Sequence, residues 1–110
     1  MSQYEELYID QGSTFEYIIT LSNPLGGSFD LTSYAARASL KRSYKSSTST
    51  NFTVTYLDSA TGRIQIYLTD EETQLLKASQ YVFDVVIESS AGAIYRVIEG
   101  IAIVNPGVTS

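Results

Sequence analysis

Apolar and polar residues alternate with a period of two along most of the chain, and Val, Ile, Thr, Tyr and Phe dominate the alternating segments. Clusters of Gly, Ser, Asn and Asp interrupt the pattern about every eight to twelve residues, a spacing typical of sandwiches and barrels. The sequence therefore predicts a nearly all-β architecture. The predicted strands cover residues 4–9, 13–21, 35–43, 52–57, 63–68, 81–88 and 94–106, the last as one bent strand or two.

The same alternation gives each strand a face that points towards the core. Seven or eight strands of this kind fit an immunoglobulin-like β-sandwich, in which two sheets bury their inner faces against each other. We therefore predict a single β-sandwich domain over residues 1–110. The positions predicted to point inward include Phe15, Tyr17, Ile19, Leu21, Ala36, Ala38, Leu40, Phe52, Val54, Tyr56, Ile64, Ile66 and Leu68.

The connections between the predicted strands differ in length. Residues 22–34 contain a proline and a glycine pair, and the Asp30 side chain can start a local turn within this long connection. Residues 44–51 are rich in serine and threonine, which predicts an exposed hairpin loop. By contrast, the short turn at residues 58–62 separates two strands that alternate in step, so residues 52–68 are predicted to form a hairpin.

One stretch, GRIQIYLTDEETQLL at residues 62–76, changes its period from two residues to about three and a half. Thr69 is followed three residues later by Glu72, the spacing of a capping box, in which each side chain binds the other residue's backbone amide. Acidic residues in the first turn also favour a helix, because they oppose its dipole. We therefore predict one short helix near residues 70–77, with Leu75, Leu76 and Ala78 covering one end of the sandwich.

Composition limits the chemistry of the chain. Cysteine and histidine are both absent, which removes disulfides, thiolate nucleophiles, the usual general base and the commonest transition-metal ligand. The acidic cluster at residues 70–72 could bind a metal, but no second carboxylate pair is placed to complete an oxygen cage. Lysines have no recognisable spacing relative to a serine nucleophile. We expect no enzymatic activity, no cofactor and no bound metal.

The formal net charge of −5 works against binding to a phosphate backbone, so no nucleic-acid partner is expected. Nor does the sequence show a signal peptide or an apolar run long enough to cross a membrane. Four of the seven basic residues nevertheless lie close together, and this cluster either meets an acidic partner surface or lies on a solvated strand and loop. The four are Arg37, Lys41, Arg42 and Lys45.

Several apolar residues fall on the outward-facing side of their predicted strands, namely Ile18, Tyr67, Val82 and Val86. Such positions are covered either by a second layer of the same protein or by a partner. Because a small sandwich has no second layer to spare, we interpret these four residues, with Arg37 and Lys41, as a protein interface. Whether the four apolar residues form one patch is left open by the sequence. Nine tyrosines also leave open a carbohydrate-binding platform, although tryptophan is absent.

Six segments along the chain form a recognisable set in a fixed order. The segments are QGSTF at 11–15, DLTSYAAR at 30–37, GRIQIYLTDEET at 62–73, YVFDVV at 81–86, RVIEG at 96–100 and VNPGVT at 104–109. Taken together, they resemble the small virion proteins of tailed bacteriophages and the N-terminal domain of phage baseplate upper proteins. That family runs from a QG-S/D-x-F strand to a glycine-led strand ending in LT-x-E-x-T and closes with G-x-V-x-V-x-P. The resemblance covers nearly the whole chain.

The resemblance implies an immunoglobulin-like docking module of an assembled particle. Its partners would be other virion proteins, its location the virion assembled in the host cytoplasm, and its arrangement several symmetric copies. Baseplate upper proteins continue into a further region, whereas this sequence ends at Ser110. The expectation is therefore a structural component of the tail, baseplate, neck or capsid decoration, with a carbohydrate- or host-surface-binding module as the alternative.

Overall fold

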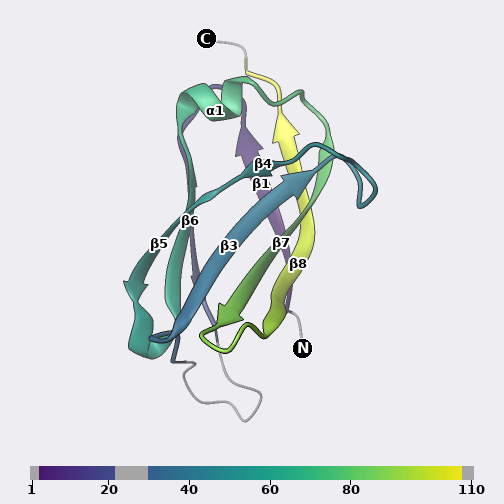
Figure 1. Cartoon of the computed structure of the whole chain (residues 1–110). Coiled ribbons are helices and arrows are strands. Elements are labelled where there is room, and N and C mark those ends of the chain that lie inside the picture. The colour runs from purple at the N-terminus through teal and green to yellow at the C-terminus, as the bar shows by residue number, and fades with distance from the viewer. Residues whose placement is uncertain (1–2, 22–29, 108–110) are drawn as a thin grey trace.

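The computed structural model describes residues 3–21 and 30–107 of the chain. Within these residues, eight strands form two sheets that pack face to face (Figure 1). One sheet has the strand order β1-β8-β7-β3-β4 and the other the order β2-β6-β5. The elements are β1 (Gln3–Asp10), β2 (Phe15–Thr20), β3 (Tyr34–Lys41), β4 (Thr50–Asn51), β5 (Thr53–Asp58), the 3-10 turn η1 (Ser59–Thr61), β6 (Arg63–Leu68), α1 (Asp70–Gln74), β7 (Gln80–Ser89) and β8 (Ile94–Asn105).

All neighbouring strands are antiparallel except β1 and β8, which run parallel. The two strands come from opposite ends of the described chain, so β1 closes the five-stranded sheet with a long-range pairing. Gly100 of β8 lies opposite Glu5 of β1, where a methyl group would meet the Glu5 carbonyl oxygen. The absence of a side chain at Gly100 therefore permits this close pairing.

The core lies between the inner faces of the two sheets, as the alternation predicts. Burying each of its large aliphatic side chains stabilises the fold by about 1.5–3 kcal/mol relative to exposure. Among the predicted inward positions, Tyr17, Ala36, Val54 and Tyr56 are only partly buried and pack against the edge of the core. The fully buried large side chains are Leu7, Ile9, Leu31, Leu40, Ile64, Ile66, Leu68, Ile87, Ile98, Val85 and Thr73.

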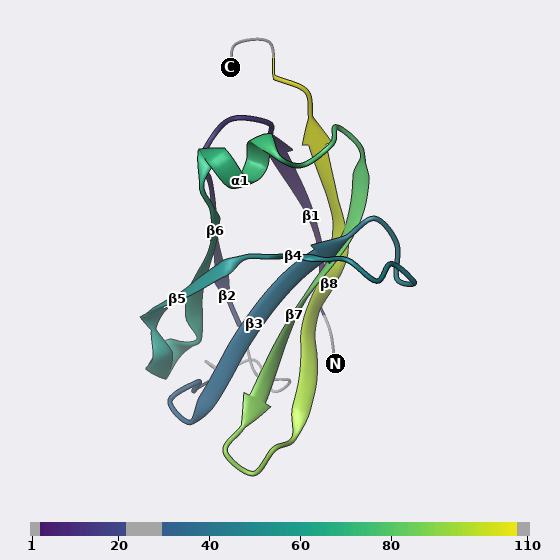
Figure 2. The same ribbon diagram turned by 45° about the horizontal axis from the view of Figure 1, so that its top comes forward.

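The predicted hairpin at residues 52–68 is confirmed. Val54 lies opposite Ile66 and Tyr56 opposite Ile64, so both strands present their apolar residues to the same face. The short strand β4 continues almost directly into β5, but β4 pairs with β3 in one sheet and β5 with β6 in the other. The chain therefore crosses between the sheets at Phe52. The tilted view of Figure 2 shows the chain passing from β4, beside β3, to β5, beside β6.

The capping box is also confirmed, because the Glu72 amide donates to the Thr69 hydroxyl and the Thr69 amide donates to the Glu72 carboxylate. The short helix near residues 70–77 is confirmed, and α1 ends at Gln74. Leu76 is buried beyond that end, whereas Leu75 and Ala78 are exposed. The helix end has a tertiary cause, because the Gln11 side chain donates to the Leu76 carbonyl at 2.7 Å and holds the chain in a non-helical path.

The two long connections meet the expectations where the structure describes them. The Thr32 amide and hydroxyl both donate to the Asp30 carboxylate, which confirms the local turn. The rest of that connection, residues 22–29, lies outside the described residues. Residues 42–49, between β3 and β4, form the exposed loop that the sequence predicts, and the next two residues form β4.

Candidate functional site

The outer face of the five-stranded sheet carries four of the six predicted interface residues. Strand β7 alternates strictly, so Val85 is fully buried while Val82 and Val86 are half-buried and turn away from the core. On the neighbouring strand β3, Lys41 lies opposite Val82 and Arg37 lies opposite Val86. The antiparallel register therefore brings these two valines and two cations onto one surface.

A β-bulge in β8 completes this surface. Val85 lies opposite Ile98 and Val86 lies opposite Arg96, which leaves Val97 as the extra residue on β8. An extra residue reverses the face on which the following side chains lie. The bulge therefore buries Ile98 in the core and places Arg96 on the outer face.

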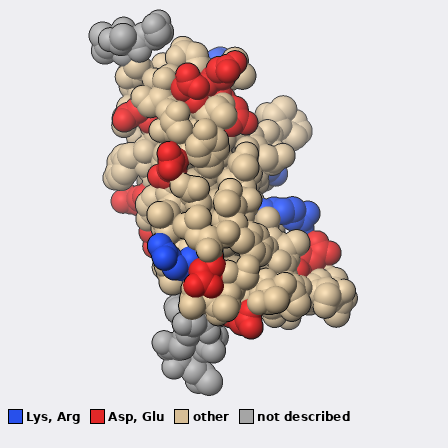
Figure 3. Space-filling model, turned by 90° about the vertical axis from the view of Figure 1, so that its left-hand side faces the viewer, with Lys and Arg blue, Asp and Glu red and all other residues tan. Residues whose placement is uncertain are grey.

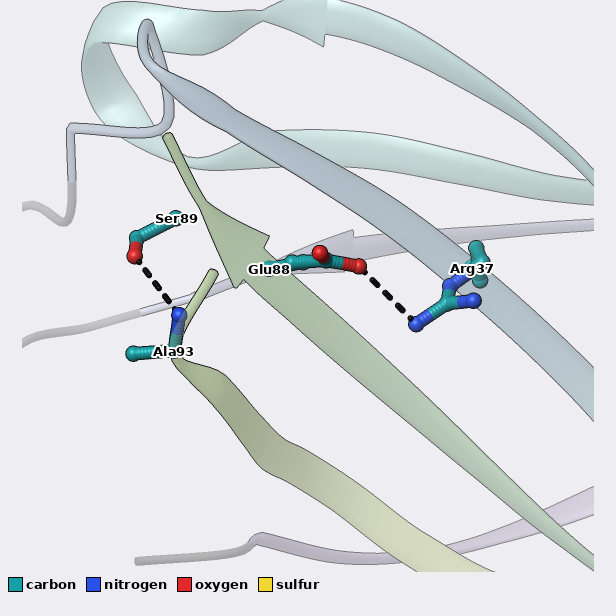
Figure 4. Close-up of polar contacts among 4 residues, drawn as sticks. All are labelled: Arg37, Glu88, Ser89 and Ala93. Carbon is teal, nitrogen blue, oxygen red and sulfur yellow. Dashed lines mark hydrogen bonds and ion pairs between the residues drawn. The ribbon is translucent and has the colours of Figure 1, made fainter. Parts of the chain in front are cut away.

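Ion pairs hold the arginines of this outer face. The Arg37 guanidinium lies 3.3 Å from the Glu88 carboxylate, and Figure 4 shows the two side chains reaching from β3 and β7 towards each other. Arg96 lies 3.2 Å from Asp84 and 4.0 Å from Glu99. Exposed pairs of this kind contribute little to stability, but they neutralise charge across the middle of the face. The same close-up shows the Ser89 hydroxyl accepting a hydrogen bond from the Ala93 amide in the β7–β8 turn.

An apolar row crosses the same face beside the ion pairs. The register places Tyr8 of β1 opposite Ile103 of β8, and Ile101 of β8 opposite Val82 of β7. The three aliphatic side chains are half-buried and the Tyr8 side chain is 60% exposed. Sequence reasoning did not include Tyr8, Ile101 and Ile103, because the bulge and the parallel pairing that align them are not visible in local alternation.

Ile18 and Tyr67 lie on the opposite side of the molecule. Both turn away from the core, as predicted, and Ile18 is 52% exposed, but they belong to the outer face of the β2-β6-β5 sheet. These two residues and the two valines therefore do not form one patch, because alternation gives the face of a strand and not the sheet to which the strand belongs. Figure 3, viewed from the side of β5 and β6, shows mostly uncharged residues there, with acidic side chains gathered towards the end where α1 lies.

A shallow groove of about 510 Å³ runs beside β3, where the chain leaves for the other sheet. Its only carboxylate among the described lining residues is Asp84, which is engaged by Arg96. The groups with shifted ionisation lie elsewhere. The hydrogen bond from the Tyr17 hydroxyl to Glu5 raises the pKa of Tyr17, and hydrogen bonds from Thr32 lower the pKa of Asp30.

Residues 3–21 and 30–107 contain no group of three or more acidic side chains with the geometry to hold a metal ion. The same residues contain no helix of the length and apolar character needed to cross a bilayer. The acidic residues 70–72 act in the structure as the first turn of α1.

Comparison with known proteins supports the fold. No protein-family model matches the chain, and no curated protein matches it. Among solved structures, one from a study of multimeric cell-adhesive interactions of VGSC beta subunits aligns over 93% of this chain and 92% of its own, with a TM-score of 0.53 and 16% identity. The two-sheet architecture and this similarity confirm an immunoglobulin-like β-sandwich with one short helix.

Two weaker similarities have TM-scores of 0.48. An internalin-like protein of Listeria monocytogenes is 16% identical over 94% of this chain and 28% of its own. A chain from the complex of ICOS with ICOS-L and an anti-ICOS-L VNAR domain is 15% identical over 96% of this chain and 56% of its own. At these identities, similarity concerns the fold and not the partner.

Proposed function

We propose that this chain is a non-enzymatic docking module of a tailed-bacteriophage virion, which binds other virion proteins through the outer face of its five-stranded sheet. The observation that carries the proposal is the apolar row of Tyr8, Ile103, Ile101 and Val82 beside neutralising ion pairs. An exposed apolar row favours a partner that covers it, because apolar surface is more stable when it is removed from water.

The size of the face favours several copies acting together. The four long strands β1, β8, β7 and β3 are spaced by about 4.8 Å and are roughly eight residues long, so the outer face of the sheet has an area on the order of 500 Å². A stable pairwise interface buries about 800 Å² on each partner, so the face alone is small for a tight one-to-one complex. Repetition around a symmetric particle would raise the overall strength of attachment without new contacts. The resemblance of the six sequence segments to virion proteins supports such a setting.

The proposal is tested by purifying particles from cells in which the phage carrying this sequence replicates. We expect mass spectrometry to find the chain in the purified particles at a fixed ratio to the major capsid protein. A cryo-electron microscopy map should then locate it at the tail, baseplate, neck or capsid surface, with the five-stranded sheet against a neighbour. Presence in the lysate but absence from purified particles would overturn the virion role.

A glycan-binding module is the second candidate, and one observation favours it. Tyr4 and Tyr8 are 62% and 60% exposed on the same face of β1, at a separation of about 13 Å for four residues of strand. The two rings make no ring–ring contact among the described residues. Binding to a glycan array that Tyr4→Ala and Tyr8→Ala each abolish, with normal assembly of both variants, would favour this candidate over docking.

A further inference from the structure

A second concave site lies at the end of the sandwich, between the loop after β3 and the segment that joins α1 to β7 (Figure 1). It is a pocket of about 240 Å³, and residues from these two distant parts of the sequence line it together. The sequence predicted only the first part as a basic cluster. The lining residues are Leu40, Lys41, Arg42, Thr48, Ser49, Thr50, Leu75, Leu76, Lys77 and Tyr81.

The charge of this pocket is opposite to that of the protein. Lys41, Arg42 and Lys77 are three of the seven basic residues in a chain whose net charge is −5. No carboxylate stands among the described residues that line the pocket, and none of the three cations has an ion pair within the described part of the chain. By contrast, Arg37 and Arg96 on the sheet face are both ion-paired. The pocket therefore gathers cations without ion pairs, next to a sheet face whose arginines are ion-paired.

The pocket is also partly organised before any ligand binds. The Arg42 guanidinium lies over the Tyr81 ring, 5.6 Å from its centroid, and the buried Tyr81 hydroxyl donates to the Lys77 carbonyl at 2.8 Å. Tyr81 thus contacts the side chain of one cationic residue, Arg42, and the backbone of another, Lys77, on a separate segment. Holding a guanidinium against a ring reduces the side-chain entropy that a ligand would otherwise have to remove.

Its lining combines three kinds of chemistry. The cations offer charge, and Thr48, Ser49 and Thr50 offer hydroxyl groups. Leu75, which is 85% exposed, lines the pocket with them and adds an apolar surface. A small inorganic anion would use the charge and leave the leucine in water, whereas a peptide with carboxylates and an apolar side chain would cover both.

We propose that this pocket binds an acidic peptide segment of a partner protein, in which carboxylates meet Arg42 and Lys77 and an apolar side chain covers Leu75. The pocket adjoins the sheet face, since Lys41 lines it and lies opposite Val82, but the proposal does not depend on the virion role. Nucleic acid is disfavoured as the ligand because the remaining surface is acidic and repels a phosphate backbone.

The test uses a fluorescein-labelled decapeptide of Asp and Glu with a central Leu, and fluorescence anisotropy with the full chain. We expect saturable binding that weakens as salt rises, and no binding of the matched Asn and Gln peptide. The double variant Arg42→Gln/Lys77→Gln should bind at least about ten-fold more weakly, in line with the loss of two charge-assisted contacts. The control Lys45→Gln/Arg63→Gln removes the same charge outside the pocket and should bind like the unmodified chain.

The apolar part of the site has its own test. Leu75→Ser should weaken binding several-fold without lowering thermal stability, because Leu75 is exposed, and replacing the central Leu of the peptide with Ser should then cause no further loss. Equal weakening by the two double variants would indicate diffuse attraction and overturn the proposal. So would an absence of saturable peptide binding, whether or not inorganic phosphate or an acidic oligosaccharide binds to the chain instead.

Discussion

At the scale of single residues, Thr69 gives the clearest link between sequence and stability. Its hydroxyl accepts from the Glu72 amide at 3.1 Å, and its own amide donates to the Glu72 carboxylate at 2.9 Å. We expect Thr69→Ala to lower the free energy of unfolding by roughly 1 kcal/mol, the usual cost of losing an N-cap, and Thr69→Asp to retain most of it. Urea unfolding measures the change. Thr48→Ala, in an exposed loop, is the matched control, and equal midpoints for the two alanine variants would contradict the capping role.

Tyr17 provides a residue-scale prediction about pH. The hydrogen bond to Glu5, together with burial and the Glu5 charge, raises the pKa of Tyr17 above its usual value. A raised pKa in the folded state means that the protonated hydroxyl contributes stability below about pH 10, the unfolded value, and that this contribution is lost as the pH rises through the folded pKa. In an ultraviolet titration of tyrosinate formation, we expect one component that ionises above the usual pH range of tyrosine. The Tyr17→Phe substitution should remove this component, and Tyr44→Phe should leave it in place. A titration unchanged by Tyr17→Phe would count against the Tyr17–Glu5 hydrogen bond.

At the scale of the elements, the parallel pairing of β1 with β8 depends on Gly100. A Cβ atom at this position would lie 1.7 Å from the Glu5 carbonyl oxygen, and backbone atoms cannot move aside as a flexible side chain can. We therefore expect Gly100→Ala to destabilise the domain by about 2 kcal/mol or more.

Urea unfolding gives the magnitude, and amide hydrogen exchange should show protection lost first in β1. Gly107→Ala, at an exposed glycine, should change neither quantity. Intact β1 protection in Gly100→Ala would mean that β1 does not hold this register.

The sequence predicted those features of the fold that depend on neighbours along the chain. Alternation assigned Val82, Val86 and Ile18 to the outside, and the spacing of Thr69 and Glu72 placed the helix start. It could not predict the site in full, because the bulge at Val97 and the pairing of β1 with β8 join segments far apart in sequence. The basic pocket escaped prediction for the same reason.

At the scale of the whole molecule, the sandwich separates two outer faces with different chemistry. The three-stranded sheet presents Ile18 and Tyr67 among uncharged, acidic and basic side chains, whereas the five-stranded sheet presents an apolar row and ion pairs. Two faces on opposite sides cannot contact the same patch of one partner. If only one face docks, the same substitution should block incorporation into particles on that face and leave incorporation normal on the other face.

The prediction uses one substitution at three positions. Val82→Glu places a carboxylate in the apolar row beside Lys41, which can partly neutralise it, so the isolated domain should stay folded. Incorporation into particles should nevertheless fall at least about ten-fold, because burying that charge at the centre of an interface is costly. Ile18→Glu makes the same change on the other sheet and should assemble normally.

The third position, Val85, is fully buried one residue along β7, and Val85→Glu should unfold the domain because adjacent residues face opposite sides of the sheet. Circular dichroism reports folding, and mass spectrometry of purified particles reports incorporation. Normal incorporation of Val82→Glu would exclude the five-stranded face as the docking surface. Selective loss of Ile18→Glu would instead assign docking to the three-stranded sheet, since both folded variants carry the same added charge and differ only in the face that bears it.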